Sequence, residues 1–238
     1  MLDVVCFKWK SPQGYRSNFG PEQVNILRNM VARHYPDPHR FSCITDDPVG
    51  IDPDISIVPL WNDFADIQSP HGGKNPSCYR RLKLFSAEAA HIIGPRLVWI
   101  DLDMVITGDL RPIFNRTEDF VIYGDSTNPR TFYNGSLVLM TAGSRRKVWD
   151  EFDPIESPKT AMRAGHFGSD QGWISHCLGR NEATFTRKDG VWSYCCHIQK
   201  PPINSRLPKD AKVVVCHGAH DPWGYRMQTI PWVREFYR

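Results

Sequence analysis

The sequence lacks an excess of charge of either sign. Its 29 Lys and Arg residues oppose 26 Asp and Glu residues, which leaves a formal net charge of +3 over 238 residues. Proteins that bind nucleic acid through its phosphates usually carry a marked basic excess, so we expect no nucleic-acid partner. Hydrophobic residues make up 41% of the chain and aromatic residues 12%, which is enough for a core and argues against disorder.

Long apolar stretches are also missing. No run reaches the about 18 apolar residues that a membrane-spanning helix needs, so we expect no transmembrane segment. The first residues, Met1 to Phe7, contain an acid and lack the basic start and cleavage site of a signal peptide. The seven cysteines are an odd number and several lie in apolar runs, as is typical of buried free thiols in a reducing compartment. We therefore expect a cytoplasmic protein, either free or peripheral at the inner membrane face.

A complete zinc motif is a third absence. Cys195-Cys196-His197 places soft ligands side by side. No second CxxC or HxxxH pair brings the number of ligands to four, so the sequence does not favour a zinc site.

What the sequence does contain is a strand-helix-strand pattern at its start. An apolar, β-branched run predicts a buried strand over residues 2–8. Gly20-Pro21-Glu22 has the composition of a helix start, and apolar residues follow at helical spacing, namely Val24, Leu27, Val31 and Tyr35. Two further strands are expected over 41–45 and 55–59. This order is typical of a parallel sheet with crossover helices, so we expect a single α/β domain with a mostly parallel sheet flanked by helices.

The rest of the chain continues the alternation. Residues 61–77 have the Pro and Gly content of a long loop, and such loops are often functional. Periodicity predicts the remaining elements: helices over 78–93, 144–152, 169–178 and 229–237, and strands over 96–103, 120–123, 135–141 and 212–216.

Asp101-Leu102-Asp103 is the segment with the most chemical content. At the period of a strand, both carboxylates leave a continuing strand on one face. Ligands bind at the carboxyl ends of strands in open α/β sheets. Two close anions repel each other unless a cation lies between them, and their oxygens suit Mg²⁺ or Mn²⁺. The alternative is that one Asp caps the following turn while the other is solvated.

Residues 97–110, from Leu97-Val98-Trp99-Ile100-Asp101-Leu102-Asp103 to Gly108-Asp109-Leu110, resemble the "YLDxDxxxxxDL" segment of glycosyltransferase family 8. Four more segments resemble that family in the same order: Tyr79-Arg80-Arg81-Leu82, Asn134-Gly135-Ser136-Leu137, Ser169-Asp170-Gln171-Gly172, and Val214-Val215-Cys216-His217-Gly218 followed by Asp221-Pro222-Trp223. The matched order covers roughly residues 78–223. The resemblance implies a GT-A (Rossmann-like) fold, a nucleotide-diphospho-sugar donor, most favourably a UDP-sugar, and transfer with retention. It also implies a nucleotide-binding part over about 1–110 and a sugar- and acceptor-binding part over about 111–238.

The same resemblance implies a metal site. Asp101 and Asp103 would hold the divalent cation, with Asp101 also reaching the ribose, and His217 would be the third ligand. An imidazole beside two carboxylates favours Mn²⁺ over Mg²⁺. Bound to the diphosphate, such a cation stabilises the charge that develops on the leaving group.

The resemblance also assigns the donor site. Arg81 would contact the sugar or the diphosphate. Asn134, Asp170 and Gln171 would bind the transferred sugar near its anomeric carbon, with Asp170 and Gln171 as the catalytic residues. Whether Asp170 acts as a nucleophile or stabilises a short-lived ion pair stays open. The predicted donor site is completed by Lys8, Trp9, Gly135, Gly218 and His220.

Two departures from the family pattern stand out. The family often has an acidic or amide residue and a Tyr after the first strand, where uracil binds, whereas this chain has Phe7-Lys8-Trp9-Lys10. Trp9 would stack on the base and Lys8 would reach a phosphate. Asp221 replaces the usual phosphate-binding Lys, so His220 or Arg226 would take its place. A nucleotide-sugar other than a UDP-sugar therefore stays open, as does the acceptor, which can be a glycan, a lipid-linked group or a protein.

Other interpretations remain at this point. Asn134-Gly135 is a common hairpin turn, Asp170 suits the first turn of a helix, and His217 can be structural. A sugar-nucleotide nucleotidyltransferase shares this kind of sheet but needs a Gly-rich basic loop, and residues 11–16 contain one Gly. A degenerate carbohydrate- or nucleotide-binding protein is the alternative that is not an enzyme.

Overall fold

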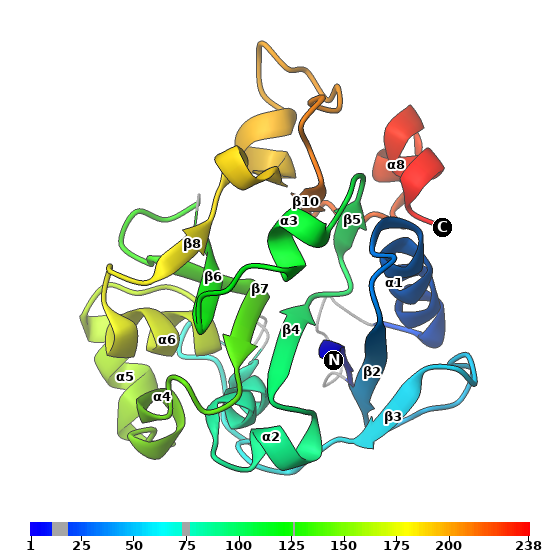
Figure 1. The fold of residues 1–238 in the computed structure, drawn as a ribbon. Helices are drawn as coiled ribbons and strands as arrows, with labels where there is room; N and C mark the ends of the chain where they lie inside the picture. Colours follow the sequence, from blue (N-terminus) through cyan, green and yellow to red (C-terminus); the bar gives the residue numbers. More distant parts are fainter. Residues whose placement is uncertain (11–18, 73–76, 126) are drawn as a thin grey trace.

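The structure is a computed structural model that describes residues 1–10, 19–72, 77–125 and 127–238. A seven-stranded sheet runs through it in the order β3-β2-β1-β4-β7-β6-β8, and a smaller sheet has the order β5-β10-β9 (Figure 1). The strands are β1 (Leu2–Lys8), β2 (His39–Thr45), β3 (Ser56–Pro59), β4 (Arg96–Ile100), β5 (Met104–Ile106), β6 (Phe120–Gly124), β7 (Tyr133–Thr141), β8 (Ala183–Phe185), β9 (Val191–Ser193) and β10 (Val213–Val215).

Helices connect and cover these strands. The α-helices are α1 (Pro21–His34), α2 (Ala89–Ile92), α3 (Arg111–Phe114), α4 (Lys147–Asp150), α5 (Glu156–Arg163), α6 (Asp170–Leu178), α7 (Tyr225–Gln228) and α8 (Pro231–Phe236). Three tighter or wider helical segments are the 3₁₀-helices η1 (Tyr79–Phe85) and η2 (Arg187–Asp189) and the π-helical turn η3 (Tyr194–Ile198). Among the described residues, no helix has both the length and the apolar character needed to cross a bilayer.

The large sheet is mixed but mostly parallel. β3, β2, β1 and β4 pair in parallel, β7 is antiparallel to both β4 and β6, and β8 is parallel to β6. One sheet therefore contains strands from both predicted parts of the chain. This confirms the predicted α/β class with a mostly parallel sheet.

The period of two along the strands divides the core into two layers. In β1, Val4 and Cys6 belong to one apolar cluster, and Val5 and Phe7 belong to the other. The first layer packs under α1, α8 and the small sheet, and the second under η1, α4, α5 and α6. Burial of each large apolar side chain stabilises the fold by about 1.5–3 kcal/mol, so both faces need a cover.

Helix α1 follows from its own sequence. Pro21 occupies the first turn, and Gln23 accepts a hydrogen bond from the Gly20 amide at 2.7 Å. The predicted apolar stripe is buried as expected, with Val24, Leu27 and Val31 fully covered. Arg33 near its end donates to the carbonyl of Arg238, which fixes the C-terminal residues beside α1 (Figure 1).

The prediction of one helix over 78–93 is wrong. The segment forms η1 and then α2, separated by Ser86 in an extended conformation with ψ 162°. η1 buries Tyr79, Arg81 and Leu84 on more than one side, so no single α-helical stripe exists there. The alternative of a hairpin turn at Asn134-Gly135 does not hold, because both residues lie within β7, where Asn134 pairs with Tyr123 of β6.

Candidate active site

Several predicted residues lie at one edge of the large sheet. β4 ends at Ile100, directly before Asp101, and β6 ends at Gly124, directly before Asp125. Because β7 runs in the opposite direction, its first residues, including Asn134, lie at the carboxyl ends of β4 and β6. The change of strand direction beside β4 therefore collects polar groups at the edge where α/β sheets bind ligands.

Arg81 joins two carboxylates that are far apart in the sequence. Its Nε and Nη2 lie 2.8 Å and 2.7 Å from Oδ2 of Asp170, while Nη1 donates to Oδ1 of Asp101 at 2.6 Å. Trp99 Nε1 donates to the same Asp101 oxygen at 3.2 Å, and the Arg81 guanidinium lies 4.5 Å from the centre of the Trp99 ring. We call Arg81, Asp101 and Asp170 the ionic cluster.

The ionic cluster is largely dry. Asp170 is 1% exposed and Arg81 is 7% exposed, whereas the Asp101 side chain keeps 24% of its surface. Burial acts to lower the pKa of Arg81, but the charges of Asp101 and Asp170 outweigh it and raise that pKa. Burial raises the pKa of Asp170 above its usual range, with Arg81 opposing this change. The cluster thus holds a permanent cation between two carboxylates, one of which faces solvent.

Gly135 allows the ionic cluster to lie against the β7 backbone. A Cβ atom at this position would lie 3.2 Å from Asp170 Oδ2 and 3.3 Å from Arg81 Nη2. Asn134 beside it is buried, and its Oδ1 accepts a hydrogen bond from the Ser136 amide at 2.9 Å. The register of β6 and β7 shifts here, between Ile122 and Tyr123 of β6, as in a β-bulge.

The small sheet brings Asp103 toward His217. β5 and β10 are antiparallel with Val215 opposite Met104, so Asp103, directly before β5, and Cys216, directly after β10, lie at the same end of the small sheet. Burial raises the pKa of the Cys216 thiol, and the charge of Asp103 acts in the same direction. The predicted metal ligands Asp103, before β5, and His217, after β10, thus lie at the same end of these two neighbouring strands.

The donor set suits Mn²⁺ or Mg²⁺. Asp101 uses Oδ1 for Arg81 and Trp99, and within the described chain no group bonds its Oδ2. Burial lowers the pKa of His217, with the nearby charge of Asp125 opposing this, so the imidazole is available in its neutral form. Carboxylate oxygens and one imidazole nitrogen match the predicted cation. The three residues do not form a closed group here: across the described ranges, the metal-ligand atoms found within 4.8 Å of one another belong to Cys195, Cys196 and His217.

The remaining predicted donor residues take other positions. Lys8 is 4% exposed, and its Nζ donates to the Asp47 carbonyl at 2.5 Å, so it holds the β2 end rather than projecting freely toward a phosphate. Trp9 is half-buried and packs edge-on against Phe7. Gln171 folds back over Gly168, and its amide donates to the Phe167 carbonyl at 3.4 Å.

The last two predicted donor residues shape the turn after β10. Gly218 has φ +73°, a conformation that favours glycine, directly after His217. His220 Nδ1 lies 3.1 Å from the His217 carbonyl oxygen. The basic loop that would separate a nucleotidyltransferase from a transferase spans 11–16, which is outside the described residues.

Asp125 is a further candidate residue that the sequence did not predict. It lines a cavity of about 370 Å³ together with Tyr123, Phe185, Arg187 and His197. Its Oδ1 accepts hydrogen bonds from Thr127, whereas its Oδ2 is buried and has no partner in the described part of the chain. The signal was present, because Asp125 follows a predicted strand just as Asp101 does.

The chain has the GT-A fold of glycosyltransferases. It is similar to the galactosyltransferase LgtC in complex with donor and acceptor sugar analogs, with a TM-score of 0.65, 14% identity, and coverage of 98% of this chain and 93% of that one. It is also similar to a structure of an LgtC active-site mutant in which glutamine is replaced by glutamate (TM-score 0.62, 13% identity, 98% and 95% coverage). The glycosyltransferase GlyE of Streptococcus pneumoniae TIGR4 matches at TM-score 0.58 and 12% identity, over 98% of this chain and 60% of GlyE. No protein-family model matches the sequence, and no curated protein matches it.

Proposed function

We propose that this protein is a metal-dependent glycosyltransferase that moves a sugar from a nucleotide-diphospho-sugar, a UDP-sugar, to an acceptor. The observation that carries the proposal is the ionic cluster of Arg81, Asp101 and Asp170 at the carboxyl edge of a GT-A sheet. The similar LgtC structure was solved with donor and acceptor sugar analogs, which supports a sugar donor and a sugar-containing acceptor for this chain.

Asp101, Asp103 and His217 would hold Mn²⁺ or Mg²⁺. When bound, the cation supplies the positive charge that stabilises a departing nucleoside diphosphate. Arg81 fixes the orientation of Asp101 by holding Oδ1, which leaves Oδ2 for ligands. The chain's own contribution is therefore a preset carboxylate that does not have to reorganise during the reaction.

The sugar would lie between the ionic cluster and the cavity beside Asp125. Buried Oδ2 of Asp125 is an acceptor for a sugar hydroxyl, and Asn134 supplies an amide nearby on β7. Asp170 is covered and bound by Arg81, so we assign it to positioning Arg81 and to the negative charge beside a developing oxocarbenium ion. This arrangement fits retention through attack on the same face better than a covalent intermediate on Asp170.

Gln171 is the residue we propose nearest the transferred sugar. It follows Asp170 at the start of α6 and is more exposed than its neighbour, so its amide can turn from Phe167 toward a ligand. The active-site glutamine named for LgtC is consistent with this role.

The test is turnover of nucleotide-sugars with and without Mn²⁺. We expect UDP-sugar hydrolysis or transfer that a chelator abolishes, and a loss of roughly 100-fold or more in kcat for Asp103→Asn, since metal stabilisation is worth several kcal/mol. Asp109→Asn is the matched control, because Asp109 lies just beyond β5 and pairs with Arg111 at the surface. Equal turnover by the two variants would contradict the proposal.

Two other outcomes would redirect it. Release of pyrophosphate from a nucleoside triphosphate and a sugar phosphate would identify a nucleotidyltransferase. Tight binding of a nucleotide-sugar with no turnover under any metal would identify a binding protein.

A further inference from the structure

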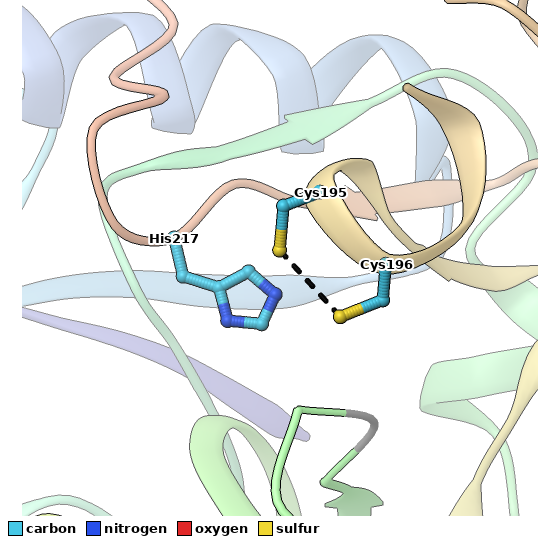
Figure 2. A group of neighbouring side chains, drawn as sticks. All are labelled: Cys195, Cys196 and His217. Carbon is cyan, nitrogen blue, oxygen red and sulfur yellow. Dashed lines mark hydrogen bonds between the residues drawn. The ribbon is translucent and has the colours of Figure 1, made fainter. Parts of the chain in front are cut away.

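Two cysteines and one histidine converge at the ends of β9 and β10. Cys195 and Cys196 lie in η3 directly after β9, and His217 lies just after β10. β9 and β10 are parallel with Ser193 opposite Val215, so the chain leaves both strands at the same end. Figure 2 shows the two sulfur atoms and the His217 imidazole directed into one space.

The spacing of these three side chains fits a metal ion. Their ligand atoms all lie within 4.8 Å of one another, and the two sulfurs are 3.6 Å apart. A tetrahedral Zn²⁺ with Zn–S bonds of about 2.3 Å holds two sulfurs roughly 3.8 Å apart. The thiols therefore already have the separation that a shared zinc ion requires.

Ser193 keeps this space polar. Its Oγ lies 2.8 Å from His217 Nε2 and 3.5 Å from Cys195 Sγ, and it accepts a hydrogen bond from the Cys196 amide at 3.1 Å. All three candidate ligands are half-buried, so an ion can enter from solvent. A hydroxyl that is hydrogen-bonded to the imidazole is a partner that a metal can displace by moving the side chains a short distance.

A disulfide between the two cysteines fits less well. Neighbouring Cα atoms are about 3.8 Å apart, whereas disulfides ordinarily span about 4.4–6.8 Å between Cα atoms. Both cysteines are also free thiols here.

We propose that Cys195, Cys196 and His217 form a binding site for a thiophilic divalent cation, Zn²⁺, with its fourth position open to water. Two thiolates and one imidazole are a soft donor set, unlike the carboxylates of Asp101 and Asp103. The sequence did not favour zinc because it offered Cys195-Cys196-His197 without further ligands. The structure replaces His197, whose Nδ1 accepts from the Ser193 amide, with His217 from another strand.

The site has a consequence that rests on the proposed function. His217 would serve both the predicted Mn²⁺ site and this one, and one imidazole cannot complete both. Zn²⁺ held by Cys195 and Cys196 would withdraw His217 and inhibit transfer.

The first experiment tests the site without any sugar nucleotide. Titration of the reduced, metal-free chain with Co²⁺ as a probe should give one ion per chain and a thiolate-to-cobalt charge-transfer band, and Zn²⁺ should displace it. Cys195→Ser and Cys196→Ser should each weaken binding about 100-fold or more, since even outer-shell changes cost 10–100-fold. Cys177→Ser, which removes another half-buried free thiol on α6, should bind as the unaltered chain does.

Alkylation of the unaltered chain gives a second measurement that does not depend on variant folding. Bound Zn²⁺ should protect Cys195 and Cys196 from an alkylating reagent, as mapped by mass spectrometry, and leave Cys177 unprotected. Absence of the band, its persistence in both Ser variants, or equal alkylation with and without Zn²⁺ would overturn the proposal.

Activity separates this proposal from the proposed function. Zn²⁺ should inhibit Mn²⁺-dependent transfer by the Cys177→Ser control at least tenfold more strongly than transfer by Cys195→Ser, each relative to its own zinc-free rate. A normal Co²⁺ titration in a chain with no transferase activity would sink the proposed function and leave the soft-metal site standing. An active enzyme that gives no Co²⁺ band would overturn the soft-metal site and leave the proposed function standing.

Discussion

The ionic cluster and the pair of cysteines facing His217 are two polar centres of opposite character. Arg81 already satisfies Asp170 and one oxygen of Asp101, and both Arg81 and Asp170 are buried. The second centre is half-buried, and its Cys195 thiol makes long contacts, at 3.5 Å to Ser193 and 3.6 Å to Cys196. A centre whose charges are paired with one another can position neighbouring groups. A centre whose sulfur and nitrogen atoms make weaker contacts can bind a ligand instead.

The difference follows from the cost of burying charge. Desolvating a guanidinium and two carboxylates costs several kcal/mol per ion, and short direct contacts have to offset that cost. Thiol and imidazole groups are less costly to bury than permanent charges, so their partners can be weak or exchangeable. Four changes test how strongly buried charged groups, compared with exposed ones, depend on their surroundings, from the largest expected effect to the smallest.

Removing the guanidinium should do the most damage. Arg81→Ala leaves the buried Asp170 unpaired, which should lower the free energy of unfolding by about 3–5 kcal/mol in urea denaturation. Arg81→Lys should recover only part of this, because one ammonium cannot reproduce the bonds to both carboxylates. Arg80→Ala on the adjacent, less buried position is the control, and equal stability of the two Ala variants would show that the ionic cluster is not what holds this edge.

Crowding the same cluster should have a smaller effect. In Gly135→Ala the new methyl lies 3.2 Å from Asp170 Oδ2, so overpacking should cost about 1–3 kcal/mol of stability. Gly124→Ala is the matched control on β6, since its Cβ meets its nearest atom, on Thr184, at 3.6 Å. If Gly135→Ala unfolds at the same urea concentration as Gly124→Ala, the ionic cluster can shift to accommodate the methyl group without loss of stability.

The open side of the site should respond in activity rather than stability. Asp125→Asn removes the charge on a buried oxygen that no group in the described ranges bonds, so folding should change little. If that oxygen accepts from a sugar hydroxyl, kcat/KM should fall about 10–100-fold, the equivalent of a hydrogen bond to a charged group. Steady-state kinetics and thermal unfolding on one preparation would separate an effect on activity from an effect on stability. A large loss of stability with normal kcat/KM would refute the binding role.

An exposed ion pair should matter least. The hydrogen-bonded Arg116 guanidinium lowers the pKa of Glu118 to about 2. The folded pKa lies below the unfolded value, so this pair contributes stability above about pH 4.5 that is lost as the pH falls toward about 2. Because the Glu118 side chain is 41% exposed, we expect the pair to contribute less than about 1 kcal/mol to the free energy of unfolding. The stability of Glu118→Gln, measured by unfolding between about pH 2 and pH 7, should lose that part of the pH dependence. An unchanged pH profile would show that other carboxylates cause the pH dependence.

Much of the fold could be predicted from local pattern. The strands near 2–8, 41–45, 55–59 and 120–123 and the helix α1 follow from apolar periodicity and from Pro21. The pattern failed at η1, where burial on several sides removes the helical stripe, and at the short elements α3, β8 and β9, which have too few residues to show a period. Asn134-Gly135, a common turn dipeptide, lies instead at the start of β7, where Asn134 pairs with Tyr123 of β6.

By itself, the sequence determined where the candidate site residues lie along the chain: Asp101 and Asp103 after a buried strand, Asp170 at a helix start, and Arg81 before them. Only the tertiary structure decided which of these side chains contact one another. It bound Arg81 to two carboxylates 20 and 89 positions away, and it exchanged His197 for His217 beside the cysteines. The physical reason is that side-chain type is local, whereas the distance between ligands depends on strand order and register, which arise only when the two sheets pack.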